Sequence, residues 1–166
     1  MSSPPTNGEQ NKDVYTHAGL SLYWAQCFEM SLTNALLLFE RATNIRVTVG
    51  ELESLEADLR RKTLSRLLNS AKKIITFDNE TKTKIDTALE ARNFLAHHFF
   101  EDRARKFLTP AGRNDMIDEL KKMQDTFMVA DTIVMALCGT LCEAIGISKE
   151  FLNTEYQRIH AEATRV

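Results

Sequence analysis

The sequence predicts an all-α protein, an antiparallel helical bundle of about five to six helices. Apolar residues recur at helical spacing over most of the chain, and no segment of useful length shows the alternation of a strand. Six Gly and three Pro are too few for the turns of a many-stranded sheet. The 166 residues, 43% of them hydrophobic, suit one domain with a sizeable core. Residues 1–12 are rich in Ser, Pro, Asn, Gly and Gln, so we expect a disordered tail there and one helical domain over residues 13–166.

The first predicted helix is long and carries two apolar faces. It runs over residues 14–42, and Tyr23, Met30 and Leu37 recur on a narrow face every seven residues. The second face is broader and comprises Leu20, Trp24, Cys27, Phe28, Ala35, Leu38, Phe39 and Ala42. Such a helix either lies deep in a bundle or is shared between a core and a partner subunit. The sequence leaves both arrangements open.

Capping signals set the starts of the next helices. Thr48, followed three residues later by Glu51, is a capping box that opens a helix reaching about residue 62. A short helix is expected over residues 63–75. Either Asp78 or Asn79 can cap a fourth helix, which ends near residue 98.

The last two helices are also bounded by recognisable residues. Thr109, followed by Pro110 at the first helical position, begins a helix that continues to residue 145 and ends at Gly146. Ser148 starts an amphipathic C-terminal helix. Its apolar residues are Phe151, Leu152, Tyr156 and Ile159.

The charge distribution is uneven. The formal net charge of −2 argues against a protein that coats nucleic acid through bulk charge. Between residues 60 and 122, however, there are fifteen Lys and Arg against nine Asp and Glu. This basic middle fits an anionic partner, and it fits an ordinary solvated surface equally well.

Several classes of protein are not indicated. Residues 1–15 lack the features of a secretory signal, and the longest apolar run, residues 35–39, is too short to span a bilayer. Three cysteines, Cys27, Cys138 and Cys142, form neither a disulfide framework nor a zinc set. No phosphate-cradling glycine loop is present. We therefore expect a cytoplasmic protein with no membrane contact, no metal and no cofactor.

Two charged residues interrupt apolar stripes. Arg92 lies within the buried side of the fourth helix, and Asp131 lies within that of the fifth. A guanidinium keeps its charge in a protein and needs a carboxylate, water or an anionic ligand there. One interpretation is a structural ion pair between Arg92 and Asp131. The other is a polar cleft in which Arg92 faces a phosphate.

The segment around Arg92 carries a motif. Residues 91–100 read ARNFLAHHFF, in which Asn93 follows Arg92 and His97 comes after four intervening residues. This pattern resembles the signature of the HEPN superfamily of helical-bundle proteins. His98 also falls within the spacing of that signature, so either histidine can be the functional one. The resemblance covers the helical order over residues 14–159, and only this segment is specific.

The resemblance implies a metal-independent endoribonuclease that acts as a homodimer, with the Arg and His of both subunits in one cleft. His97 would transfer protons as an RNA 2′-hydroxyl attacks the adjacent phosphate, and Arg92 would bind that phosphate. The products would be a 2′,3′-cyclic phosphate and a 5′-hydroxyl. Asn93 would position the histidine or the phosphate, unless its amide bonds its own helix end. Such a nuclease could be a toxin or defence effector with a separate antitoxin chain.

Helix geometry adds a constraint on this pair. Arg92 and His97 are five residues apart, about 140° around an ideal helix. Both can reach one phosphate only if the helix loosens near Ala96, or if the two groups come from different subunits. The second alternative independently predicts a symmetric dimer.

Residues after the motif extend the hypothesis. Arg103, Arg105 and Lys106 suit contacts with an RNA backbone, and solvated loop charge explains them equally well. The aromatic residues Phe94, Phe99 and Phe100 either stack a base or, more commonly, belong to the core.

A second functional hypothesis belongs to a different class. The chain would then be a non-catalytic helical-bundle adaptor or dimerisation module. In that case Arg92, Asn93 and Asp131 only hold the bundle or dimer together.

Overall fold

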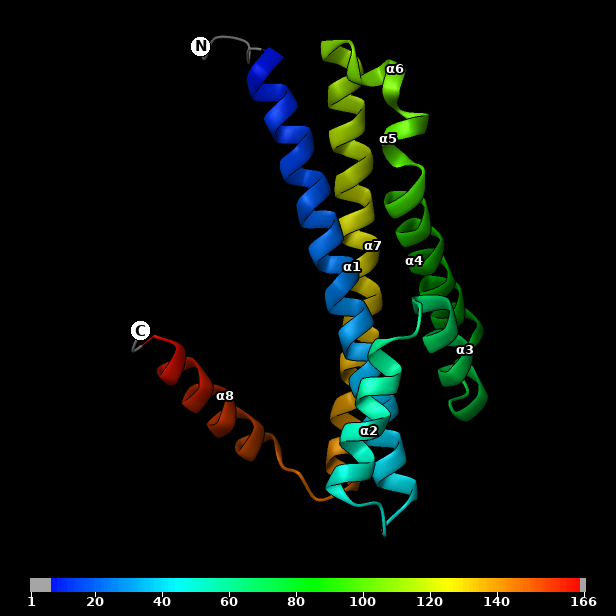
Figure 1. The fold of residues 1–166 in the computed structure, drawn as a ribbon, viewed down its shortest axis with the longest axis vertical. Coiled ribbons are helices and arrows are strands. Elements are labelled where there is room, and N and C mark those ends of the chain that lie inside the picture. Colours follow the sequence, from blue (N-terminus) through cyan, green and yellow to red (C-terminus); the bar gives the residue numbers. More distant parts are fainter. Residues whose placement is uncertain (1–6, 165–166) are drawn as a thin grey trace.

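The all-α prediction is confirmed. The computed structural model describes residues 7–164, which contain helices and no strand (Figure 1). The six helices expected from the sequence are present, and the charged stretch before Thr109 forms two further helices of four residues each. In chain order the helices are α1 (Asn7–Thr43), α2 (Val49–Arg60), α3 (Leu64–Ile74), α4 (Asn79–His97), α5 (Phe99–Asp102), α6 (Ala104–Phe107), α7 (Pro110–Ala144) and α8 (Lys149–Ala163).

The two longest helices, α1 and α7, lie side by side and run in the same direction (Figure 1). Hydrogen bonds pair Gln10 with Arg113 and Ser21 with Gln124, in both cases 103 residues apart. This constant offset is that of parallel helices. The chain reverses four times between α1 and α7, through α2, α3 and α4, and an even number of reversals restores the direction. The predicted antiparallel arrangement therefore fits α4 against its long neighbours and is wrong for α1 with α7.

The core lies where α1, α4 and α7 meet. Phe28 and Leu32 of α1, Ile85 of α4, and Phe127 and Val134 of α7 are each completely buried. The shorter α2 and α3 cover the core near the C-terminal half of α1 (Figure 1). Burial of these side chains removes a large apolar area from water and positions α4, which carries the motif.

The helix starts follow the predicted capping residues. Thr48 and Glu51 form a reciprocal capping box, with the Glu51 carboxylate 2.8 Å from the Thr48 backbone nitrogen. Asp78, rather than Asn79, caps α4 by accepting from the Thr81 nitrogen. Thr109 and Ser148 likewise cap α7 and α8. These bonds satisfy backbone donors that each first turn leaves unpaired.

The predicted disordered tail is wrong for residues 7–12, which form the start of α1. Gln10 is buried, and its side-chain oxygen accepts from two nitrogens of Arg113 at 3.2 and 3.0 Å. Its amide nitrogen donates to Asn114. These bonds to α7 hold a polar segment that composition alone assigns to the tail. Residues 1–6 lie outside the described part of the chain.

Helix α7 also passes a simple test for a membrane-spanning helix. An 18-residue stretch of it has a mean hydropathy of 1.6, and it is the one described helix long and apolar enough to cross a bilayer. Ten of its residues are buried within the protein, and core helices pass the same test. The absence of membrane contact thus stays a prediction.

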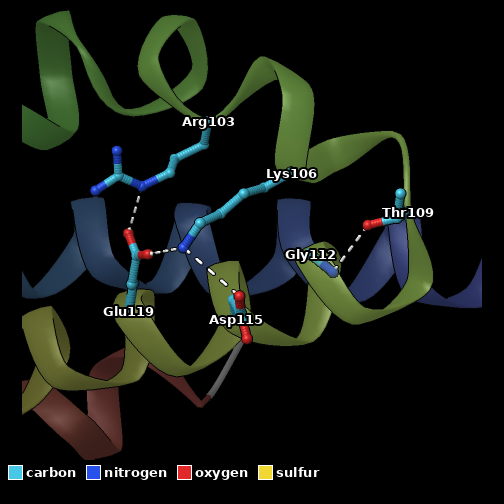
Figure 2. A network of polar contacts seen from close by, with 6 residues as sticks. All are labelled: Arg103, Lys106, Thr109, Gly112, Asp115 and Glu119. Atoms are coloured by element: carbon cyan, nitrogen blue, oxygen red, sulfur yellow. Dashed lines mark hydrogen bonds and ion pairs between the residues drawn. The ribbon is translucent and has the colours of Figure 1, made fainter.

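Gly112 sets how closely α6 approaches α7. A Cβ added there would lie 2.2 Å from the Lys106 carbonyl oxygen. Its backbone nitrogen donates to the Thr109 cap (Figure 2). Glycine inside a helix lowers helix stability by about 1 kcal/mol relative to alanine. At this position only glycine leaves room for the close approach of α6.

Replacing Gly112 by alanine is expected to destabilise the protein by about 1–3 kcal/mol, because the Lys106 backbone must move to admit the methyl group. Urea unfolding followed by circular dichroism measures the change. The matched control is Gly50→Ala in α2, where the added Cβ meets nothing within 4 Å. An equally stable Gly112→Ala variant would contradict the tight approach.

Candidate functional site

The predicted motif spans the end of α4. His97 is the last residue of this helix, and His98 follows as its cap. Both imidazoles are exposed, with their ring centres 6.2 Å apart. Asn93 is half-buried one turn before His97, and its amide makes no hydrogen bond within residues 7–164. It therefore does not bond its own helix end and stays available to a ligand.

Arg92 is half-buried and pairs with a residue that sequence reasoning missed. Its Nε donates to the Glu29 carboxylate of α1 at 2.9 Å. The two side chains remain 25% and 28% exposed, so the pair lies at the edge of the α1–α4 contact and is not sealed in the core. Glu29 follows the buried Phe28, and this position beside the apolar face was the one signal in the sequence.

The predicted pair between Arg92 and Asp131 is wrong. Asp131 accepts a 2.6 Å hydrogen bond from Ser31, which lies on the part of α1 that faces α7. Residue 29 lies about 200° around α1 from residue 31. Helix α1 therefore separates the two predicted partners, and each pairs with a different side of it.

The motif helix stays intact over the residues that matter. The His98 nitrogen donates to the Phe94 carbonyl at 2.9 Å, so no loosening occurs near Ala96. Arg92 and His97 consequently remain about 140° apart around α4. The structure thus excludes the loosened helix as a route to one shared phosphate, and the route through two subunits stays a prediction.

An apolar groove lies beside the end of α4. It has a volume of about 390 Å³ and is lined by side chains of α1, α4 and α5, among them Tyr15, Leu22, Ala96 and Phe100. Tyr15, Leu22 and Phe100 are exposed, whereas Leu95 in the same groove is buried. No charged residue lines this groove within the described residues. Its chemistry suits a protein surface rather than a phosphate.

The three motif aromatics have different environments. Phe99 is completely buried and belongs to the core. Phe94 is half-buried against Phe99, with the Arg103 guanidinium 5.2 Å from its ring centre. Phe100 is exposed beside Tyr15. Phe100 is thus the motif phenylalanine whose ring is most available to a base.

Two of the three predicted RNA-binding cations are already paired. Arg103 Nε and Lys106 Nζ each contact a Glu119 carboxylate oxygen at 2.7 Å (Figure 2). Lys106 also lies 3.6 Å from Asp115. Arg105 is exposed and has no ion pair within the described chain. The structure therefore leaves Arg105 free and uses the other two cations to fasten α5 and α6 to α7.

Two other kinds of chemistry, a reactive thiol and a metal site, find no support in the described residues. Burial, reinforced by Cys142 and Asp131, raises the pKa of the Cys138 thiol to about 11, so this sulfur is a poor nucleophile at neutral pH. Within residues 7–164, no group of three His, Cys, Asp or Glu side chains is arranged to hold a metal ion.

Comparisons with known proteins identify no relative. No protein-family model, no curated protein and no solved structure matches this chain significantly.

A double-mutant cycle on Arg92 and Glu29 is expected to give a coupling energy of about 1 kcal/mol. Removing either partner leaves the other charge half-buried and unpaired. The cycle comprises Arg92→Ala, Glu29→Ala and the double variant, each unfolded in urea. The exposed pair Arg60 and Glu56 is the control, with a coupling of about 0.3–0.5 kcal/mol. Equal coupling energies in the two cycles would show that the half-buried pair of Arg92 and Glu29 stabilises the protein no more than an exposed pair does.

Low pH is expected to weaken the ion pairs of Glu119 with Arg103 and Lys106, called here the Glu119 cluster. Partial burial opposes ionisation of Glu119, but hydrogen bonds from Lys106 and Arg103 outweigh it and lower the pKa of this carboxyl. A carboxyl whose pKa is lower in the folded than in the unfolded protein stabilises the fold at pH values above its unfolded-state pKa of about 4.3. This stabilisation is lost as the pH falls through the pKa of the folded state.

Glu119→Gln should therefore be less stable than wild type at pH 7, with the difference shrinking towards pH 3. Thermal unfolding across this range measures it. Asp118→Asn, an exposed neighbour without an ion pair in the described chain, is the control and should show no such trend. A pH-independent difference for Glu119→Gln would contradict the electrostatic role of the cluster.

Proposed function

We propose that this chain is a metal-independent endoribonuclease of HEPN type that acts as a homodimer. The observation that carries the proposal is the arrangement on α4, an exposed imidazole at the helix end and a half-buried guanidinium one and a half turns earlier. These are the residue types that RNA cleavage through the 2′-hydroxyl requires. RNA is the proposed substrate, and a cytoplasmic toxin or defence role with a separate antitoxin chain is the proposed setting.

The state of Arg92 supports phosphate binding. Glu29 contacts only the Nε atom, so neither terminal nitrogen of the guanidinium has a partner within the described residues. These nitrogens can donate to two oxygens of a phosphate while Glu29 holds the side chain in place. Glu29 thus has a positioning role.

The chemistry needs one proton removed and one supplied. The RNA 2′-oxygen attacks phosphorus as its proton passes to a base, and the bond from phosphorus to the 5′-oxygen breaks as that oxygen gains a proton. We assign both transfers to the His97 imidazoles of the two subunits, one as base and one as acid. Arg92 stabilises the negative charge that accumulates on the phosphate oxygens.

The intact helix supports a dimer. Since Arg92 and His97 point about 140° apart, we propose that Arg92 of one subunit and His97 of the other face one phosphate. The apolar groove between Leu22 and Phe100 lies at the same end of α4 and offers the contact area. Arg105 extends the cleft as a contact with the RNA backbone.

A specific observation favours the second candidate, a non-catalytic adaptor. Glu29, an acid of the same subunit, already neutralises Arg92, as a purely structural pair would. In this reading the α4 surface serves dimerisation or another protein. The two candidates differ in whether His97 has a chemical role.

The test is cleavage of a structured RNA in EDTA by wild type, His97→Ala and Arg92→Ala. We expect each variant to lose at least about 100-fold in rate, because proton transfer and charge stabilisation each supply this much. Wild-type products should end in a 2′,3′-cyclic phosphate. Circular dichroism confirms that the variants fold.

His98→Ala decides between the two histidines, and His160→Ala on α8 is an exposed-imidazole control outside the motif. Both should cleave at wild-type rate. If His98→Ala loses cleavage activity while His97→Ala keeps it, our assignment of His97 as the catalytic histidine is overturned. Full activity in all variants would overturn the catalytic site, and an inactive wild type would favour the adaptor.

A further inference from the structure

The C-terminal helix α8 leaves the rest of the fold and presents an uncovered apolar face. Figure 1 shows it diverging from the end of α7. It has no buried residue, and its four large apolar side chains are between 41% and 65% exposed. Three of these, Leu152, Tyr156 and Ile159, lie on one face at helical spacing. An uncovered helix of 15 residues is marginally stable in water, so a covering surface is expected.

The turn between α7 and α8 sets the direction of α8. The Ile147 nitrogen donates to the Cys142 carbonyl at 2.9 Å, and Gly146 has a φ of +81°, which together form a Schellman cap. Lys149 also pairs with Glu143 at 3.3 Å. These contacts direct α8, beyond its first turn, away from the rest of its own subunit.

A matching apolar surface lies on α1 and α7. A groove of about 450 Å³ is lined by Leu37, Leu38, Met135, Cys138 and Gly139, and the first turn of α8 touches it through Leu152. Gly139 has open space where a Cβ would stand, which leaves room for an inserted side chain. The apolar surface continues along α1 through Met30 and Tyr23, both more than half exposed.

We propose that the α8 helix of one copy docks on this α1–α7 surface of a second copy, and that the exchange is reciprocal. Each copy offers one arm, α8, and one receiving surface, and a reciprocal contact closes with twofold symmetry. The lengths are compatible, since the apolar residues of α8 from Leu152 to Ile159 span about 11 Å and fit within the stripe from Tyr23 to Leu38, which spans about 22 Å.

The area agrees with a stable dimer. The three apolar side chains on the docking face of α8, Leu152, Tyr156 and Ile159, expose roughly 300 Å² together. If each receiving surface loses a similar area, two arms and two receiving surfaces bury roughly 1,200 Å², at the lower end of the range for specific interfaces. This contact is separate from the groove beside His97 and does not depend on ribonuclease activity.

The test is the mass in solution of the full chain, measured by sedimentation at micromolar concentrations. Wild type should have twice the 18.9 kDa of one chain. Tyr156→Glu with Ile159→Glu on the arm, and separately Met135→Glu on the receiving surface, should raise the dimer dissociation constant at least roughly tenfold. All three positions are exposed, so the fold of each copy should survive.

The matched control is Gln157→Glu with Ala161→Glu, which adds the same charge to the opposite face of α8 and should leave the dimer unchanged. A monomeric wild type would overturn the proposal. So would arm variants that dimerise like wild type. If Leu22→Glu alone dissociates the dimer, the groove beside His97 is the interface and the arm proposal fails. None of these outcomes depends on whether the protein cleaves RNA.

Discussion

The parallel packing of α1 against α7 is the constraint on which the rest of the structure depends. Polar contacts between residues 99 to 107 positions apart, such as Ser21 with Gln124, fix the register of the two helices. A buried polar group left unpaired costs about 1–3 kcal/mol, so a slipped register would be penalised at each of these contacts. With α1 held in place, one of its sides receives α7 and another receives α4. This division brings Glu29 to Arg92 and Ser31 to Asp131.

The candidate site inherits its rigidity from this arrangement. Helix α4 is buried through Ile85, Ala88 and Leu95, and the chain after it is fastened to α7 through Glu119. The absence of a side chain at Gly112 lets that fastening be close. As a result, packing on both sides holds the backbone that carries His97. The proposed proton transfer by this residue would gain from such preorganisation.

Features set by neighbouring residues could be predicted from the sequence, and those set by distant ones could not. The caps at Thr48, Asp78, Thr109 and Ser148 depend on residues within one turn, so local chemistry was sufficient. Apolar stripes identify helices but carry no direction, which is why the parallel α1–α7 pair was not foreseen. The partner of Arg92 depends on which side of α1 faces α4, and the sequence indicates that side only through the position of Glu29 beside the apolar face.

The outer face of α1 links the two proposed interfaces. Tyr23 and Met30 lie on it, opposite the buried Phe28 and Leu32, so the seven-residue repeat marks surface at these positions and not core. The groove beside His97 borders one flank of this face, and the groove that receives α8 borders the other. The two proposed contacts therefore use different flanks of the same exposed face of α1, one near its N-terminal half and one near its C-terminal half.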